Sequence, residues 1–191
     1  MAEELKRGVD AQFGCKAFIY RVPEVYSPKF LESMHAMNPY ASSHPELTRS
    51  DIKHFSEADG FLFGLSARFG SMSAPMKSFF DSTGALWLKG SLIGKPAGIF
   101  TSTPAQGGGC ETLALAAVAV LAHHGMLFVP RGMPGNVPED EEGIASMSPF
   151  GANCMTALDG IRTPSLSERR AAVQQGADFA RAVNRMLPLK S

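Results

Sequence analysis

The sequence predicts an α/β fold, a doubly wound parallel sheet in three layers with helices on both faces. Two observations lead to this prediction: apolar strand-like runs alternate with helical patterns, and glycine-rich loops follow two of these runs. Strands that alternate with helices form parallel sheets joined by right-handed crossovers. A length of 191 residues with 45% hydrophobic content suits one compact core. We therefore expect residues 1–191 to form a single domain.

The first third of the chain is predicted to hold one helix and one strand, followed by a long connection. Residues 2–9 show the amphipathic pattern of a helix, and residues 16–22 form an apolar run that Pro23 stops. Residues 27–50 contain three prolines, which favour a connection with one short helix near residues 29–37. We assign no chemistry to this connection.

The middle of the chain alternates clearly between strand and helix. Residues 59–64 are a glycine-bounded apolar run, typical of a strand covered on both faces. A helix is expected over residues 73–81, where Ser73 can cap and Pro75 tolerates the first turn. A strand over residues 96–101 and a helix over residues 111–124 follow, and Gly125 ends that helix. The next strand is predicted over residues 126–129.

The last third combines a long polar segment with a final helix. Residues 130–164 are too many for a plain connection, so we expect a lid or a subunit contact there. Ser165 and Glu168 have the spacing of a capping box. The helix that follows is predicted to bury one apolar face, made of Leu166, Val173, Ala177, Ala180, Val183 and Leu187.

Composition excludes several classes of function. Lys plus Arg and Asp plus Glu both total 18, so the net charge is zero, and no basic block favours nucleic-acid or acidic-membrane binding. No apolar run approaches the roughly 20 residues of a membrane span, and the N-terminus resembles no secretory signal. We expect a cytoplasmic protein. Its three cysteines, which are widely spaced, predict buried or incidental thiols and not a disulfide or a metal site.

The two glycine-rich loops, residues 65–72 and 101–109, are the candidate ligand site. Both follow predicted strands, and loops at the carboxyl ends of parallel strands bind ligands in open α/β sheets. Taken alone, Arg68-Phe69-Gly70 also suits an ordinary turn with a solvated arginine, and Gly107-Gly108-Gly109 suits plain flexibility. No dinucleotide-binding G-x-G-x-x-G motif occurs.

Several motifs in residues 64–125 carry a family resemblance. They are Arg68-Phe69-Gly70, Gly84-Ala85-Leu86-Trp87, Phe100-Thr101-Ser102-Thr103 and Leu121-Ala122-His123-His124-Gly125-Met126. Together they resemble the flavodoxin-like NAD(P)H:quinone oxidoreductases once named tryptophan-repressor-binding proteins. The resemblance implies a flavodoxin-like sheet, FMN as cofactor, NADH or NADPH as electron donor, a quinone as substrate and a homotetramer. It requires no catalytic acid or base, because the cofactor carries the chemistry.

The resemblance also implies which residues bind. The residues implied to contact FMN are Ala67, Arg68, Phe69, Ser102, Thr103, Pro104, Ala105, Gln106, Gly107 and His123. Trp87 is implied to line the quinone pocket across a subunit interface. Without the resemblance, a lone tryptophan is more often a core residue, and a histidine at a helix end is equally well a cap.

This chain departs from the family pattern in ways that weaken the predicted cofactor site. It has Leu65-Ser66-Ala67 where the family has Thr-Pro-Thr, Pro104 removes an N–H donor, and Ala105 removes a hydroxyl. The family also places a first strand and an FMN-phosphate loop before the first helix. That strand would lie between residues 16–22 and 60–64 in the order 2-1-3-4-5, and we expect it to be missing here. The alternative function is therefore a non-enzymatic subunit that has lost or weakened FMN binding.

Overall fold

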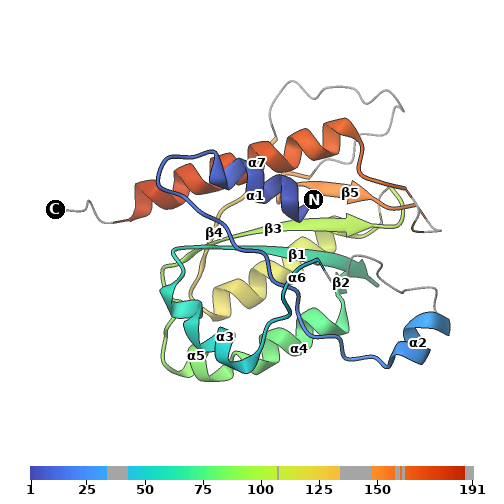
Figure 1. Cartoon of the computed structure of the whole chain (residues 1–191), viewed down its shortest axis with the longest axis horizontal. Helices are drawn as coiled ribbons and strands as arrows, with labels where there is room; N and C mark the ends of the chain where they lie inside the picture. The colour runs from blue at the N-terminus through green and yellow to red at the C-terminus, as the bar shows by residue number, and fades with distance from the viewer. Residues whose placement is uncertain (34–42, 107, 134–147, 158–159, 161, 188–191) are drawn as a thin grey trace.

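The computed structural model describes residues 1–33, 43–106, 108–133, 148–157, 160 and 162–187. Figure 1 shows a sheet with helices on both sides. In chain order the elements are α1 (Ala2–Asp10), α2 (Pro28–Ser33), α3 (Arg49–Lys53), the 3-10 helix η1 (His54–Glu57), β1 (Phe61–Arg68), β2 (Ser71–Met72), α4 (Ala74–Ser82), α5 (Gly84–Leu88), β3 (Pro96–Thr103), α6 (Cys110–His123), β4 (Leu127–Phe128), β5 (Asn153–Met155) and α7 (Leu166–Met186).

The sheet has the order β2-β1-β3-β4, with β5 also paired to β3. β1 and β3 are parallel, with Phe61 opposite Ala97 and Ser66 opposite Ser102. β4 pairs with the start of β3 and β5 with its end, so both occupy the edge of β3 that β1 leaves free. β1 pairs with β2 only at Ala67 and Arg68, and the described chain contains no other strand on that edge.

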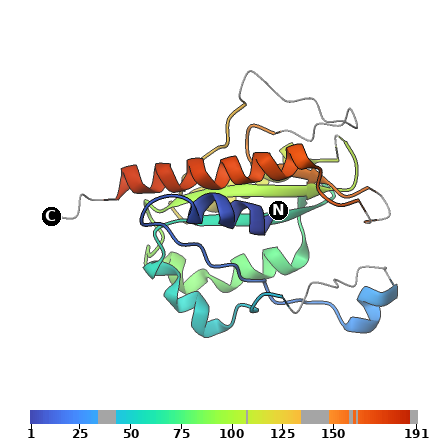
Figure 2. The same cartoon turned by 45° about the horizontal axis from the view of Figure 1, so that its top comes forward.

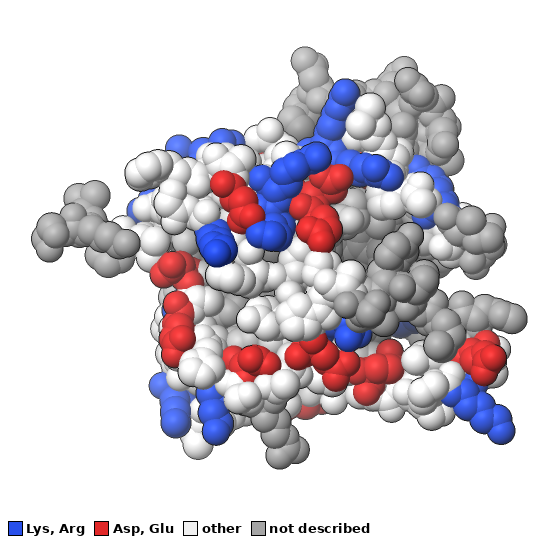
Figure 3. All heavy atoms as spheres, viewed as in Figure 1, with Lys and Arg blue, Asp and Glu red and all other residues white. Residues whose placement is uncertain are grey.

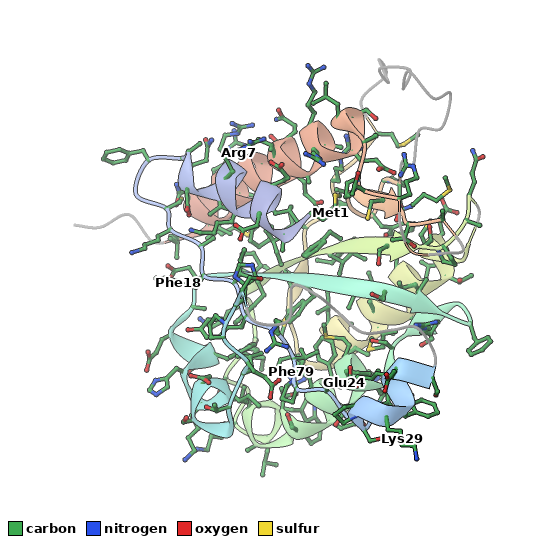
Figure 4. The ribbon with its side chains drawn as sticks, turned by 45° about the vertical axis from the view of Figure 1, so that its right-hand side comes forward. Met1, Arg7, Phe18, Glu24, Lys29 and Phe79 are labelled. Carbon is green, nitrogen blue, oxygen red and sulfur yellow. The ribbon has the colours of Figure 1, made fainter. Side chains whose placement is uncertain are left out.

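The helices form two layers, one on each face of the sheet. Figures 1 and 2 show α1 and α7 on one face and α3, α4, α5 and α6 on the other. The larger core lies under α4 and α6, where Phe79 of α4 is buried against the aromatic rings of β1 (Figure 4). The predicted α/β class in three layers is confirmed.

α1 and α7 pack unusually closely because glycine lies at both contacts. A Cβ on Gly8 would lie 2.0 Å from the carbonyl oxygen of Val173, and one on Gly176 would lie 2.1 Å from that of Leu5. Real Cβ atoms do not approach a carbonyl so closely, so only glycine permits this crossing. The pair of glycines therefore fixes how α1, predicted over residues 2–9, lies against α7.

Gln175 of α7 bonds to the backbone in the gap between β4 and β5, the two strands that share one edge of β3. Its buried amide donates to the carbonyl of Ile99 at 2.7 Å and accepts from the N–H of Ala152 at 2.7 Å. Gly151 is needed beside it, because a Cβ there would lie 1.9 Å from the same Ile99 oxygen. A side chain thus satisfies two buried backbone groups that a strand would otherwise pair.

The capping box at the start of α7 is confirmed, and its carboxylate does more than cap. Glu168 accepts from the N–H of Ser165 at 2.8 Å, from the N–H of Met155 at 3.0 Å and from Arg162 at 2.9 Å. Glu168 is buried, and so are Gln175 and Gly176, whereas Leu166 is exposed. The predicted apolar face was therefore wrong at Leu166 and at Leu187, which is also exposed and follows the last residue of α7. The buried face of α7 instead uses polar side chains to hold the sheet.

One predicted strand is wrong. Residues 16–22 run extended but form no ladder, and their one bridge joins Arg21 to Glu46. Phe18 is 69% exposed on this segment, whose position Figure 4 shows. A strand needs a hydrogen-bonded neighbour, and among the described residues this segment has none beyond that bridge. The missing first strand that we predicted beside it stays a prediction.

Other predicted boundaries shift. β1 continues to Arg68 and turns into β2, so most of the predicted loop 65–72 is strand. Ser73 lies at the N-cap of α4 but makes no side-chain cap bond. α3 and η1 were not predicted, and residues 34–37 of the predicted short helix lie outside the described residues.

The segment predicted as a lid or subunit contact contains part of the sheet. β5 lies within residues 130–164 and pairs with β3, while residues 134–147 lie outside the described residues. A role as lid or contact stays a prediction for the rest.

The face of the molecule drawn in Figure 3 carries charges of both signs. Figure 3 shows Lys and Arg beside Asp and Glu over α1, where Arg7 pairs with Glu4 at 2.6 Å and Lys6 pairs with Asp10. In the part of the chain that the structure describes, no helix is both long and apolar enough to cross a membrane.

Candidate functional site

Three strand ends meet at one edge of the sheet. β1, β3 and β5 are parallel, so their carboxyl ends at Arg68, Thr103 and Met155 lie at the same edge. The turn at Phe69 and Gly70 follows β1, and residues 104–109 follow β3. This is the place where open α/β sheets bind ligands, as predicted from the sequence.

The two predicted loops touch each other. Gly70 and Gly109 both have positive φ, 74° and 83°, and a Cβ on Gly109 would lie 3.3 Å from the Cα of Gly70. Thr112 donates to the carbonyl of Gly109 at 3.0 Å, and Ser102 donates to Ser66 at 3.3 Å between the strands. Loops that are distant in sequence therefore form one continuous surface.

Phe69 is the most unusual residue on this surface. Its φ is 51°, in the left-handed region that costs a non-glycine residue about 1–2 kcal/mol, and its side chain is fully exposed. The N–H groups of Phe69, Ala105 and Gln106 make no hydrogen bond within the described chain. A strained, exposed aromatic beside unused donors is typical of a surface that meets a ligand.

The structure brings most of the predicted loop residues together. Arg68 is exposed, and Ala67 and Ser102 are half-buried at the strand ends. Thr103 is buried, and its carbonyl accepts from the N–H of Thr156 at 2.9 Å. The remaining predicted loop residues are Pro104, Ala105 and Gln106, which lie on the loop itself, and Gly107, which lies outside the described residues.

The sequence analysis did not predict two residues whose side chains support the loops and strand ends at this edge of the sheet. Thr112 lies in the first turn of α6 and supports the second loop, and Thr156 follows β5 and supports the end of β3. Thr112 could have been found from its spacing of three residues after Gly109. Thr156 could not, because its position depends on β5, a strand of three residues in a polar segment.

Trp87 and His123 do not join these loops within one chain. α4 and α6 both run back from the loops, so α5 and the end of α6 lie at the amino ends of the strands, as Figure 1 shows. The N–H of Gly94 donates to the carbonyl of Gly125 at 2.8 Å, just before the start of β3. β3 has eight residues, which separates its two ends by roughly 25 Å. Trp87 is 56% exposed and His123 is exposed at that far end.

The surroundings of Cys110 and Cys154 do not favour a reactive thiolate. Burial, helped by Glu111, raises the pKa of the Cys110 thiol at the start of α6. Burial also raises the pKa of Cys154 to about 11, so both thiols stay protonated at neutral pH. All three cysteines are free.

Comparison with protein families decides where the chain belongs. The model of the family described as NADPH-dependent FMN reductase matches residues 1–135. This chain belongs to the NADPH-dependent FMN reductase family. The matched residues of this FMN reductase family member include both loops, Trp87 and His123.

Named relatives of this family member are quinone reductases. The chain is 42% identical over 97% of its length to NAD(P)H quinone oxidoreductase PST3 of Candida albicans, covering 91% of that protein. It is 44% identical over 94% of its length to Quinone-oxidoreductase QR2 of Triphysaria versicolor, covering 86%. It is 38% identical over 97% of its length to an NAD(P)H dehydrogenase (quinone) of Trichlorobacter lovleyi, covering 91%.

Solved structures support the fold. A flavodoxin, WrbA-like protein from Agrobacterium tumefaciens superposes with a TM-score of 0.58 at 19% identity, over 74% of this chain and 76% of that one. An oxidoreductase from Corynebacterium diphtheriae superposes with a TM-score of 0.56 at 15% identity, over 96% and 85%. The flavodoxin-like class that the sequence predicted is therefore confirmed.

The loop residues of this FMN reductase family member fit the ring of a flavin. An isoalloxazine ring needs an apolar wall and a few fixed donors, which Phe69 could supply together with the N–H groups of Ala105 and Gln106, unpartnered among the described residues. A Cβ on Gly108 would lie 2.7 Å from the carbonyl of Ala105, so only glycine permits this tight loop. The loop also leads into α6, a helix of 14 residues whose N-terminus favours an anionic group.

Proposed function

We propose that this chain is an FMN-dependent NAD(P)H:quinone oxidoreductase. The observation that supports this most directly is the loop surface around Phe69, where a strained, exposed aromatic lies beside unused N–H donors at the strand ends. Its relatives carry the names of quinone oxidoreductases. When bound, FMN would accept a hydride from NAD(P)H and pass two electrons to a quinone, which takes up two protons and leaves as the hydroquinone.

The residues of this chain would bind and orient. Backbone N–H groups of Phe69, Ala105 and Gln106 would donate to the polar atoms of the ring, and the Phe69 side chain would line its apolar side. Arg68, exposed at the end of β1, would supply a positive charge that favours the reduced, more negative form of a bound flavin. The apolar Phe69 ring would also help to exclude water from the bound flavin.

Trp87 and His123 are proposed to reach this loop surface from a second copy of the chain. They lie at the amino ends of the strands, roughly 25 Å from the loops of their own chain. Leu88, the next residue after Trp87, is exposed, and so is Ile93 in the segment that follows α5, and exposed apolar residues suit a subunit interface. A homotetramer located in the cytoplasm is part of this proposal.

FMN titration with fluorescence quenching tests the proposal. We expect tight FMN binding, and quinone reduction with NADH or NADPH by the loaded protein. Arg68→Ala should lower turnover per bound flavin, whereas Arg170→Ala, which removes an exposed arginine of α7, should not. Absence of FMN binding, also after a strand and loop of the family type are added before Ala2, would support the non-enzymatic subunit instead.

Mixing of variants tests the shared site. Arg68→Ala removes a side chain from the loop surface of one copy. Trp87→Ala removes a side chain that the second copy is proposed to bring to that surface. If each site takes residues from two copies, some sites in a mixed oligomer are fully wild-type, so the mixture should recover activity that neither variant has alone. Additive activity in the mixture would mean that each chain builds its own site.

A further inference from the structure

His124 and Thr83 form a buried polar pair between α6 and the junction of α4 with α5. Their side chains are 7% and 2% exposed, and His124 Nε2 lies 2.9 Å from Thr83 Oγ1. Thr83 Oγ1 also lies 2.6 Å from the carbonyl oxygen of Phe80, which can only accept. The single hydroxyl hydrogen therefore goes to Phe80, and Thr83 accepts from the Nε2–H of His124.

This assignment fixes the tautomer of His124. With its proton on Nε2, the ring carries a lone pair on Nδ1, and that atom is buried without a hydrogen-bond partner in the described chain. The Phe80 ring lies beside it, with the ring centroids 6.4 Å apart. The neutral imidazole suits this apolar site, whereas an imidazolium would place an unpaired N–H donor there.

The pair joins the two segments that carry Trp87 and His123. Thr83 is the N-cap of α5, and its carbonyl accepts from the N–H of Leu86 at 2.9 Å and of Trp87 at 3.1 Å. His124 is the C-cap of α6 and follows His123 directly. One side-chain hydrogen bond therefore connects the N-cap of α5 with the C-cap of α6.

We propose that Thr83 and His124 are positioning residues that hold Trp87 and His123 in a fixed relation, so that one copy presents both to the flavin site of the next. This rests on the proposed function, in which those two residues cross a subunit interface. Neither Thr83 nor His124 needs to touch the cofactor or the substrate. Their role is to hold α5 and the end of α6 in a fixed relative position.

The hydrogen bond should depend on pH. Burial, and then repulsion from His123, lowers the pKa of His124 below its usual value. The folded state therefore favours the neutral ring, and the stability that this contributes is present above pH about 6.5 and falls as the pH drops below it. The other ionisable side chains on the helices that the pair joins are Lys77 and Asp81, which pair with each other on α4, and Cys110 and Glu111 at the opposite end of α6. Lys89 and Lys95 follow α5, and Lys95 donates to the carbonyl of Ala58.

Trp87 provides a readout that needs neither flavin nor activity, because it is the single tryptophan of the chain. We would record its emission in the flavin-free protein between about pH 8 and pH 5. The wild type should show a transition below the ordinary histidine value as the pair is lost. His124→Gln keeps a donor near Thr83 but does not titrate, so its emission should stay flat, while His123→Gln, the matched control, should keep the transition.

Kinetics give the second readout. Thr83→Val removes the acceptor, and we expect it to raise the KM for the quinone about fivefold, which corresponds to the free energy of one ordinary hydrogen bond. Thr83→Ser retains the hydroxyl and should restore the wild-type KM, which separates positioning from a general loss of folding.

The two proposals fail in different ways. If the wild type reduces no quinone, the proposed function fails, and the emission experiment still decides whether the pair holds α5. A transition that persists in His124→Gln, or one that disappears in His123→Gln, would overturn the role of His124. An unchanged KM in Thr83→Val would overturn the positioning role.

Discussion

Replacing Gln175 by leucine tests how much the Gln175 side chain, which fills the gap between β4 and β5, contributes to the free energy of unfolding. The Gln175 amide serves the carbonyl of Ile99 and the N–H of Ala152, each at 2.7 Å, and the side chain is 3% exposed. Leucine has a similar size but no polar atom, so both backbone groups lose their partner while staying buried. The change therefore isolates two hydrogen bonds and leaves the packing volume nearly constant.

The magnitude follows from the two orphaned groups. An unsatisfied buried donor or acceptor costs about 1–3 kcal/mol, which gives about 2–6 kcal/mol for the pair. The leucine gains some apolar burial, so we expect the lower part of that range, about 2–4 kcal/mol. For a domain of this size, that lowers Tm by about 4–16 °C.

Urea unfolding followed by circular dichroism measures this loss. Gln174→Leu is the matched control, because Gln174 is exposed on the same helix and donates only to Asp178 at 3.0 Å. It should change the unfolding free energy by less than about 0.5 kcal/mol. If Gln175→Leu is as stable as this control, the amide does not satisfy the two backbone groups, and the reasoning is refuted.

A second variant at this position changes the pH dependence. Gln175→Glu can still accept from Ala152, but it can donate to Ile99 only when protonated. Its folded pKa should therefore rise above the unfolded value of about 4.3, so the variant is most stable below that value and loses stability as pH rises through the folded pKa. We expect it to approach the wild type near pH 4–5 and to be clearly weaker at pH 8.

Two further predictions concern α1 and the loop surface. Gly8→Ala would place a Cβ 2.0 Å from the Val173 carbonyl, so α1 should separate from α7 and become sensitive to limited proteolysis, whereas Gly84→Ala, with nothing within 4 Å, should not change the digestion pattern. Phe69→Asn should leave folding stability unchanged or raise it by up to about 1 kcal/mol, because asparagine tolerates positive φ, while it weakens FMN binding in the titration. Loss of both stability and binding in Phe69→Asn would mean that Phe69 supports the fold and not the ligand.

Most elements could be predicted because their signals are local. The runs that became β1 and β3 are apolar without alternation, and α6 ends at His123, two residues before Gly125, whose φ is 69°. The capping box of Ser165 and Glu168 was correct for the same reason. Residues 16–22 have an equally good strand pattern and form no strand, because strand formation also requires a neighbour to bond with.

The loop half of the candidate site was also predictable, since it needs only the order of strands and the glycines after them. The placement of Trp87 and His123 was not predictable from their neighbours in sequence. It follows from the direction in which α4 and α6 return across the sheet, which puts both residues at the end opposite the loops.

The sequence by itself determined the α/β class, the helices and strands with strong periodicity, and the two loops at the strand ends, because each depends on residues within one short segment. Only the tertiary structure decided that Gln175 completes the sheet beside Gly151, that Glu168 holds β5, and that Thr83 accepts from His124. These contacts join residues that lie far apart in the chain. Their energy comes from satisfying buried polar groups, and which groups are buried is known only once the layers have packed.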